Sequence, residues 1–432
     1  MKKYTLPIGK TQQEVLLPEE HVIYDIHGNE ATVCQNIAEA TLEAIRNPIG
    51  TKPLREIVKP DEKIAIIISD ITRLCGTKEF LPVIIEELNS IGVKDDDITI
   101  VVATGTHRGH TPEEDLVVCG EEIVKRFKII QHDSRDKASM VSLGKTSIGN
   151  DVSINRHVAE ADRIILTGAV TLHPFAGFGG GRKALMPGVA DYDSIMLNHC
   201  LTMSPVEGEG CNKACDASLL ENNPVNIDMM DACSLADPDF LVNTVFTPDG
   251  EISEIVAGHW RKAWDKGCKD LLAMSGVYIK ELADVVFASA GGFPKDLNLY
   301  QATKCHMNAT FAVKKGGIMI FTLDCLDIKE PAIFTDCFSR SDMEQFEKDI
   351  RADFSIAAFV AFKARCIVND VTAYLVTRPE NFDFVKKTGH IPCNTLEEAW
   401  ALAQEKLREQ GKTDYTITVM SHASATLPIL EN

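Results

Sequence analysis

The chain has 432 residues, a formal net charge of −19 and 45% apolar residues. At roughly 150 residues per domain, this length allows two or three domains. The negative charge argues against a nucleic-acid partner, because binding phosphates needs a basic surface. No apolar run approaches the ~20 residues of a membrane helix, and the N-terminus lacks the apolar stretch of a secretion signal. We therefore expect a cytoplasmic protein with neither a nucleic-acid nor a membrane partner.

The cysteine pattern points to reduced thiols. The 13 cysteines run from Cys34 to Cys393 and include no CxxC pair. Cys211 and Cys215 lie four residues apart, but no second pair completes a zinc-binding spacing. We expect free thiols, as is usual for a large intracellular protein.

Strands and helices alternate in the first part of the chain. Lys63–Ser69 is a continuous β-branched run, typical of a strand buried on both faces. Phe80–Ile91 has the periodicity of an amphipathic helix, and Ile98–Ala103 is a second buried strand. This strand–helix–strand order predicts a parallel sheet. Arg163–Leu166 is a third strand of the same character, and Phe240–Ile255 reads as a hairpin.

The strand–helix pattern restarts near Ala283. Asp284–Ser289 and Ile318–Leu323 are predicted strands on either side of a helix at Leu297–Val313, and Tyr415–Met420 is a final strand. We expect an α/β fold with two domains, each a mainly parallel sheet flanked by helices, and an active site in the cleft between them. The predicted domains are a cofactor-binding domain at residues 1–278 and an α/β domain at residues 279–432. The final strand could pack back on the first domain.

Polar side chains follow three of the predicted strands. The first strand leads into Asp70–Arg73, the second into Gly105–His107, and the third into a segment that ends at His173. Ligands of open parallel sheets bind outside the carboxyl ends of the strands. Imidazole is the usual general acid or base near neutral pH and a common metal ligand. These three strand ends therefore predict a site, although either histidine alone could belong to a core.

The strongest local signal is the segment Ala176–Gly188, which contains five glycines. Glycines let backbone N–H groups approach an anion, and a helix N-terminus after them would favour phosphate. The segment is not a Walker A loop, because Arg182 precedes Lys183 and Ala184 follows it. Lys183 could bind a phosphate or form a covalent attachment. A flexible surface loop is the weaker interpretation.

Two further places complete the candidate set. His199 lies sixteen residues after Lys183 and, taken alone, is more typical of a core histidine than of a ligand. Gln301 and Lys304 are three apart on a predicted helix, so they share a face that suits a carboxylate. A solvated helix face is the alternative.

Together these residues resemble the nickel-dependent lactate racemase family. The matching pieces occur in the same order over most of the chain, and the joint pattern is specific although each piece alone is weak. They are Asp70-x-Thr-Arg73, Gly105-Thr106-His107, His173, the GGGRK run Gly179–Lys183, Asn198-His199, Tyr300-Gln301-x-x-Lys304 and His422-Ala-Ser-Ala.

The resemblance implies a nickel-pincer nucleotide, the nickel complex of pyridinium-3,5-bisthiocarboxylic acid mononucleotide. In the family this cofactor is tethered to a lysine, here Lys183, and is made by separate cofactor-synthesis proteins. A histidine, here His199, completes the square plane of Ni(II), which soft sulfur and imidazole donors suit. Further cofactor contacts are expected from the strand-end and glycine segments, namely Asp70, Gly105, Thr106, Gly179, Gly180, Gly181 and Arg182.

The same resemblance implies racemisation or epimerisation of a small 2-hydroxy acid by reversible hydride transfer. His107 and His173 would be the two bases, one for the hydroxyl of each enantiomer. Arg73, Tyr300, Gln301 and Lys304 would bind the substrate, with Arg73 and Lys304 on its carboxylate. Asp70 would orient either a base or the nucleotide.

Two departures from the family pattern leave the identity of the acid open. Leu74 follows Arg73 where the family usually has proline. The tryptophans are Trp260, Trp264 and Trp400, so the substrate-pocket tryptophan of some members is absent, and we expect Phe359 or Phe362 in its place. Both differences concern the shape of the substrate.

Two alternatives compete with this interpretation. One is a nicotinamide-dependent dehydrogenase, against which the missing GxGxxG after a first strand counts. The other is a non-catalytic carrier or storage protein for a phosphorylated cofactor, against which the retention of both candidate bases counts.

Overall fold

The computed structural model describes residues 1–340 and 342–431, which form two compact α/β units. Unit 1 comprises Met1–Glu30, Met203–Cys211 and the chain from Met274 onward. Unit 2 comprises Ala31–Thr202 and Asn212–Ala273. The fold class is as predicted. The division differs from a single boundary at residue 278, because the first thirty residues supply strands to unit 1 and the chain enters unit 1 again after Thr202.

Unit 2 is built on a six-stranded sheet, ordered β13-β12-β9-β4-β5-β6. All neighbouring pairs are parallel except β12 with β13, which form the predicted hairpin. The strands of the unit are β4 (Ile64–Ser69), β5 (Ile98–Ala103), β6 (Ile129–Gln131), β7 (Met140–Lys145), β8 (Asp151–Asn155), β9 (Arg163–Val170), β10 (Leu172–His173), β11 (Gly177–Phe178), β12 (Phe240–Phe246) and β13 (Ile252–Gly258). Its helices are α1 (Ile37–Arg46), α2 (Leu54–Ile57), α3 (Thr77–Ser90), α4 (Pro112–Cys119), α5 (Glu121–Arg126), α6 (Arg156–Ala159), α7 (Tyr192–Cys200), α8 (Pro224–Ala236) and α9 (Trp260–Ser275).

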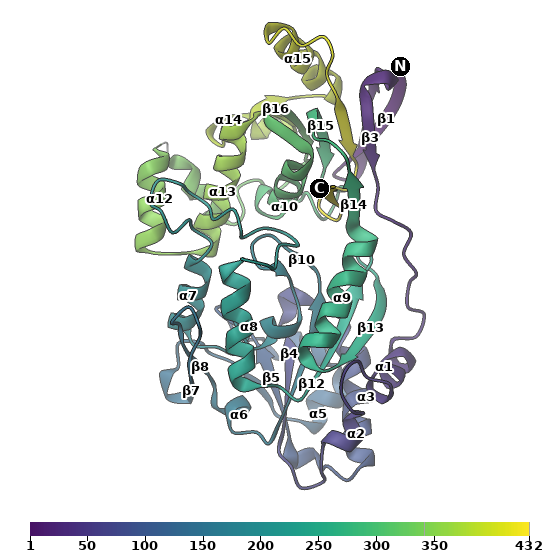
Figure 1. Ribbon diagram of the computed structural model, residues 1–432, viewed down its shortest axis with the longest axis vertical. Coiled ribbons are helices and arrows are strands. Elements are labelled where there is room, and N and C mark those ends of the chain that lie inside the picture. Colours follow the sequence, from purple (N-terminus) through teal and green to yellow (C-terminus); the bar gives the residue numbers. More distant parts are fainter. Residues whose placement is uncertain (341, 432) are drawn as a thin grey trace. The chain divides into compact units, whose positions relative to one another are not determined.

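The central strands of unit 2 are buried on both faces. In β4 every residue from Ile64 to Ile68 is buried, as the continuous apolar run predicts. On one face, Phe80 and Ile84 of α3 pack in a core with Ile66 and Ile68. On the other face α9 lies close to the sheet: an added Cβ at Gly267 would come within 3.0–3.3 Å of three strand valines. Figure 1 shows α8 and α9 alongside these strands.

Unit 1 is built on a wholly parallel sheet, ordered β18-β17-β16-β15-β19-β3. Its strands are β1 (Lys2–Ile8), β2 (Thr11–Leu17), β3 (Val22–Ile26), β14 (Gly276–Ile279), β15 (Ala283–Ser289), β16 (Val313–Thr322), β17 (Thr372–Val376), β18 (Ile391–Cys393), β19 (Ile417–Met420) and β20 (Leu427–Leu430). Its helices are α10 (Leu299–Ala309), α11 (Ala332–Thr335), α12 (Met343–Ala352), α13 (Ile356–Asp370), α14 (Phe382–Lys387) and α15 (Leu396–Glu409). Among the described residues, none of the helices has the length and apolarity needed to cross a bilayer.

The two ends of the chain meet in unit 1. The predicted final strand, β19, lies between β15 and β3, and β3 comes from the first thirty residues. The hairpin β1–β2 packs Leu6 and Leu17 in one core with Phe287 of β15 and Trp400 of α15. The final strand therefore joins the N-terminal residues, but within unit 1.

Asp284, at the start of β15, ties three separate parts of unit 1 together. Its carboxylate accepts hydrogen bonds from Lys314 at 2.8 Å, from Lys412 at 2.7 Å and from the backbone N–H of Thr416 at 3.2 Å. Burial opposes its ionisation, but the bonds from the two lysines hold the pKa of Asp284 well below its usual value. We predict that Asp284→Asn lowers the free energy of unfolding by about 1–3 kcal/mol at pH 7.

Chemical denaturation at several pH values tests this prediction. A carboxylate with a depressed folded-state pKa stabilises the protein above its unfolded pKa of about 3.9 and loses that contribution as the pH falls further. The difference between wild type and variant should therefore shrink below pH 4. Glu14→Gln, which removes an exposed pair with Lys3, is the control and should change stability by less than about 0.5 kcal/mol. Equal losses for both variants would contradict the assignment.

Candidate active site

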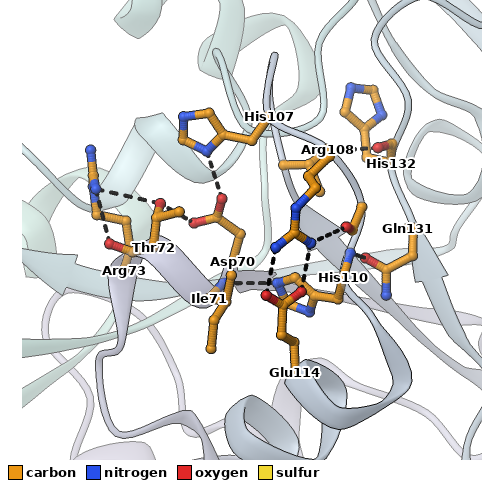
Figure 2. Close-up of polar contacts among 12 residues, drawn as sticks. Asp70, Ile71, Thr72, Arg73, His107, Arg108, His110, Glu114, Gln131 and His132 are labelled. Carbon is orange, nitrogen blue, oxygen red and sulfur yellow. Dashed lines mark hydrogen bonds and ion pairs between the residues drawn. The ribbon is translucent and has the colours of Figure 1, made fainter. Parts of the chain in front are cut away.

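Asp70 and His107 form a pair at the carboxyl ends of β4 and β5. His107 Nδ1 lies 2.6 Å from Asp70 Oδ2, and the Thr72 hydroxyl donates to Asp70 Oδ1 at 2.7 Å (Figure 2). Burial would raise the pKa of Asp70, but the hydrogen bonds from His107 and Thr72 lower it below its ordinary value. An ionised Asp70 accepts the proton on Nδ1, so His107 presents Nε2 as the atom that can take up a proton.

His110 holds the backbone next to Asp70 in place, a role that the sequence did not predict. Its Nε2 accepts the backbone N–H of Ile71 at 2.8 Å, and its Nδ1 donates to Asp115 at 2.9 Å. In the same turn, Arg108 forms a bidentate ion pair with Glu114 at 2.6 and 2.7 Å (Figure 2). The sequence shows two histidines three positions apart, His107 and His110. Their spacing does not indicate which one is the candidate base and which one binds the backbone of Ile71.

Arg73 lies on the turn that follows Asp70. Its guanidinium is exposed and donates to the backbone oxygen of Thr72 at 2.9 Å. Its positive charge is one of the causes that lower the pKa of both Asp70 and Lys183. Arg73 is therefore an electrostatic neighbour of Lys183 in unit 2, although the two lie 110 positions apart in the sequence.

Gly105 links the His107 turn to the glycine-rich segment. Its N–H donates to the backbone oxygen of Gly188 at 2.9 Å, and its φ of +55° favours glycine. Thr106 is exposed beside it. The backbone around Gly105 is occupied by this contact, whereas the side chain of Thr106 faces solvent.

The glycine-rich segment folds back on itself and does not begin a helix. His173 in β10 pairs with Gly177 in β11, and Gly181–Ala184 forms a single 3-10 turn. The helix N-terminus that the sequence suggested after the glycines is absent from this segment, and the next α-helix, α7, begins at Tyr192. Pro187 and Gly188 follow the turn and interrupt helix propagation.

The buried side chain of Arg182 holds this segment through hydrogen bonds to its backbone. Its Nη1 donates to the oxygen of Phe178 at 2.8 Å, its Nη2 to the oxygen of Ala176 at 2.7 Å and its Nε to Asn226 at 3.1 Å. The guanidinium also lies 4.0 Å from the ring centroid of Trp264. The side chain is fully buried, and burial lowers its pKa to about 10. We predicted a cofactor contact here; instead the nitrogens bind the protein, so Arg182 supports the loop.

Two further hydrogen bonds fix the glycines. Trp264 Nε1 donates to the oxygen of Gly179 at 2.8 Å, and the N–H of Gly181 donates to Asn243 Oδ1 at 2.7 Å. Gly180 has φ +67° and ψ −169°, and an added Cβ there would lie 2.7 Å from the oxygen of Ala169. The glycines are thus required by close packing within the protein.

Lys183 lies beside His173 and Phe175. Its Nζ is 3.3 Å from His173 Nε2 and 5.8 Å from the centroid of the Phe175 ring. Burial, together with the charges of Arg182 and Arg73, lowers the pKa of Lys183 well below its ordinary value. A lowered pKa favours the neutral amine, which is the nucleophilic form of lysine.

His199 is a buried histidine on α7 with a defined tautomer. Its Nδ1 donates to the backbone oxygen of Ile195 at 2.8 Å, so the neutral ring carries its lone pair on Nε2. Burial and the charge of Lys183 lower its pKa to about 4. The Phe175 ring lies 5.6 Å away, edge-on, and so contacts both His199 and His173. A neutral imidazole with an oriented lone pair is the usual form of a metal-ligating histidine.

Asn198 anchors the helix next to His199. Its amide nitrogen donates to Asp228 at 2.9 Å and to the oxygen of Val225 at 3.1 Å.

The residues from 1 to 340 and 342 to 431 contain no group of three His, Cys, Asp or Glu side chains arranged to hold a metal ion.

The remaining candidates lie on α10 and α13 in unit 1. Asn298 caps this helix by accepting the N–H of Gln301 at 2.9 Å. Gln301 and Lys304 are exposed on it, as their spacing predicts. Tyr300 is half-buried, with its ring edge-on to Phe334 at 5.3 Å. Phe359 and Phe362 are buried in unit 1, each beside another phenylalanine.

Two models of known protein families match successive parts of the chain. The family model for the lactate racemase N-terminal domain matches residues 8–210, and that for the lactate racemase C-terminal domain matches residues 279–426. The chain belongs to the lactate racemase family.

Individual lactate racemases match over most of the chain. The protein of that name from Thermoanaerobacterium thermosaccharolyticum is 31% identical over 428 residues, covering 95% of this chain and 96% of its own. The one from Lactiplantibacillus plantarum is 35% identical over 326 residues, covering 74% of each chain. The solved lactate racemase apoprotein from T. thermosaccharolyticum superposes with a TM-score of 0.87 at 29% identity, covering 99% of this chain and 100% of that one.

The hydrogen bond from Trp264 to Gly179 can be tested against a matched residue. Trp264→Phe removes it and leaves a buried carbonyl without that donor, so we predict a loss of about 1–2 kcal/mol in unfolding free energy. We also expect faster hydrogen exchange at the amides of residues 179–183. Trp260→Phe on the same helix is the control, because the buried Nε1 of Trp260 has no hydrogen-bond partner among the residues that the structure describes. Both changes remove similar volume, so equal effects would show that the hydrogen bond contributes nothing.

Proposed function

We propose that the protein racemises or epimerises a small 2-hydroxy acid by reversible hydride transfer, using a nickel-pincer nucleotide tethered to Lys183. The observation that carries the proposal is the grouping of Lys183 and His173 with His199 in unit 2, beside the pair formed by Asp70 and His107. Membership of the lactate racemase family supports this choice of reaction.

The residues of unit 2 fit the proposed cofactor. His199 presents a neutral Nε2, as a single protein ligand of nickel should, and the other donors would belong to the cofactor. Lys183 is a partly buried amine with a lowered pKa, which suits covalent attachment. When bound, the cofactor supplies an acceptor for the hydrogen on C2 of the substrate as hydride.

The two candidate bases meet different groups at Nδ1. The Nδ1 of His107 donates to Asp70, so its Nε2 can accept the hydroxyl proton of the substrate. The Nδ1 of His173 accepts the N–H of Ala176 at 3.2 Å, and its Nε2 lies 3.3 Å from Lys183 Nζ. Racemisation by two bases requires each imidazole to take the hydroxyl proton of one enantiomer and, as imidazolium, to return a proton when the reaction runs the other way. The carboxylate of Asp70 would stabilise the imidazolium form of His107.

The substrate would be held by its carboxylate. The planar guanidinium of Arg73 is exposed next to the turn that carries Asp70 and suits bidentate binding. Lys304 and Gln301 offer further polar groups from α10, and Tyr300 an aromatic ring. Because the family's pocket tryptophan is missing, we propose a substrate class of lactate-like or larger 2-hydroxy acids.

Nickel content and the mass of the Lys183 peptide test the cofactor directly. Protein produced together with the cofactor-synthesis proteins should contain nickel, and the Lys183 peptide should carry an added mass. Lys183→Ala should lose the added mass, and His199→Ala should keep the added mass on Lys183 while losing most of the nickel. Unmodified Lys183 and no nickel, in a host that loads another family member, would refute the proposal.

Replacing His107 tests the role of the Asp70–His107 pair. We predict that His107→Asn lowers the racemisation rate by about 10²–10⁴-fold, since general acid–base catalysis is worth that much. Asp70→Asn should lower it by at least about 10-fold, because the amide no longer fixes the imidazole tautomer. Initial rates from each enantiomer, measured by chiral chromatography, report the effect. Unchanged nickel content would show that cofactor binding survives.

The same variants separate the alternatives. A carrier or storage protein would have no turnover to lose in His107→Asn, and a nicotinamide-dependent dehydrogenase would need an added dinucleotide. A substrate deuterated at C2 gives a second criterion: hydride transfer should retain the label in the product, whereas exchange with solvent would indicate proton abstraction at carbon.

A further inference from the structure

Outside the candidate active site, two cysteines from distant parts of the sequence lie together in unit 1. Cys211 ends the segment Met203–Cys211, and Cys366 lies on α13. Sγ of Cys366 is 3.8 Å from the position that a Cβ would take on Gly210, the neighbour of Cys211. The two thiols are hydrogen-bonded to each other, and both residues are half-buried.

The segment that carries Cys211 is closed on itself. Met203 and Cys211 form an antiparallel bridge, and the N–H of Ser204 donates to the oxygen of Gly210 at 2.8 Å. The Ser204 hydroxyl also donates to Glu209 at 2.8 Å. A short loop closed at both ends holds its terminal cysteine in a defined place.

One buried carboxylate fixes this loop to α12. Glu347 of α12 accepts the N–H of Gly208 at 3.0 Å and that of Gly210 at 3.1 Å. Arg351 pairs with Glu347 and donates to the oxygen of Val206 at 3.2 Å. Glu347 is 3% exposed, so these bonds are shielded from water. The loop is therefore fastened one residue before Cys211, which keeps that thiol beside Cys366.

Cys366 differs chemically from most other cysteines of the chain. The hydrogen bond from Cys211 lowers the pKa of Cys366 despite its burial and the nearby carboxylates, and the charge of Lys363 acts in the same direction. In contrast, burial raises the pKa of eight other cysteines, namely Cys75, Cys119, Cys233, Cys268, Cys305, Cys325, Cys337 and Cys393. Because the thiolate is the reactive form, the lowered pKa makes Cys366 a better nucleophile than these eight cysteines.

We propose that Cys211 and Cys366 form a peroxide-sensitive modification site that closes to a disulfide. The Cys366 thiolate attacks hydrogen peroxide: an S–O bond forms, the O–O bond breaks, and the departing hydroxide takes up a proton to give water. Cys211 then attacks the sulfenic sulfur; the S–S bond forms, the S–O bond breaks, and a second water leaves. Two thiols are oxidised and one peroxide is reduced. The product would join the loop covalently to α13 and restrain the chain that follows His199.

This inference is independent of the proposed function, because its readout is a covalent bond. Reduced full-length protein is treated with a small molar excess of hydrogen peroxide, alkylated and digested without reduction. Trypsin with Glu-C releases Gly210–Lys213, which separates Cys211 from Cys200 and Cys215, and Cys366–Glu380, because trypsin does not cut between Arg378 and Pro379. We expect these two peptides to be linked, two hydrogens lighter than their sum, and to separate on reduction.

Three variants test the roles of the two thiols. Cys211→Ser should leave a sulfenic acid on Cys366 that dimedone traps, whereas Cys366→Ser should leave Cys211 as an alkylatable thiol. Cys34→Ser, at another half-buried cysteine, should form the cross-link as the wild type does. Recovery of Cys211 and Cys366 as separately alkylated peptides after peroxide treatment of the wild type would overturn the proposal. So would linkage of either one to a different cysteine.

Discussion

A buried guanidinium fixes the geometry on which the candidate site of unit 2 depends. An unpaired charge inside a protein is strongly unfavourable, so Arg182 can remain there only if its donors are satisfied. Two of them bind backbone oxygens of the same loop, and the planar group stacks on Trp264. Because the guanidinium is rigid, the loop between His173 and Lys183 must adopt one shape. Burial lowers the pKa of Lys183, and the charge of Arg182 acts in the same direction.

The hydrogen-bond partners of the three site histidines determine which ring nitrogen of each side chain carries a hydrogen. His107, His173 and His199 have the same side chain, but each ring meets a different group at Nδ1: a carboxylate, a backbone N–H and a backbone oxygen. These partners decide which ring nitrogen carries the hydrogen. The backbone and one aspartate therefore set the tautomers of the three rings.

The sequence predicted the central strands well because their burial leaves a simple signal. Lys63–Ser69 and Ile98–Ala103 are β-branched runs, and the observed strands end where polar residues begin. The grouping of Asp70 with His107 followed from parallel strands that end at one edge. The internal role of Arg182 could not be predicted, because an arginine beside glycines resembles a phosphate ligand until its burial is known. The support from His110 was likewise invisible, because it depends on a contact with Ile71 across forty residues.

Neither unit is a continuous stretch of chain, and this has a consequence for synthesis. The backbone passes between the units after residues 30, 202, 211 and 273. In unit 1, β3 pairs with β19, so a strand made among the first residues waits for one near the end before the sheet is complete. Pairing of strands so far apart in the sequence is slow, because the entropic cost of closing the intervening loop comes before the strand contacts can offset it. On the ribosome unit 2 can assemble first, whereas the pairing of β3 must wait until β19 has been made.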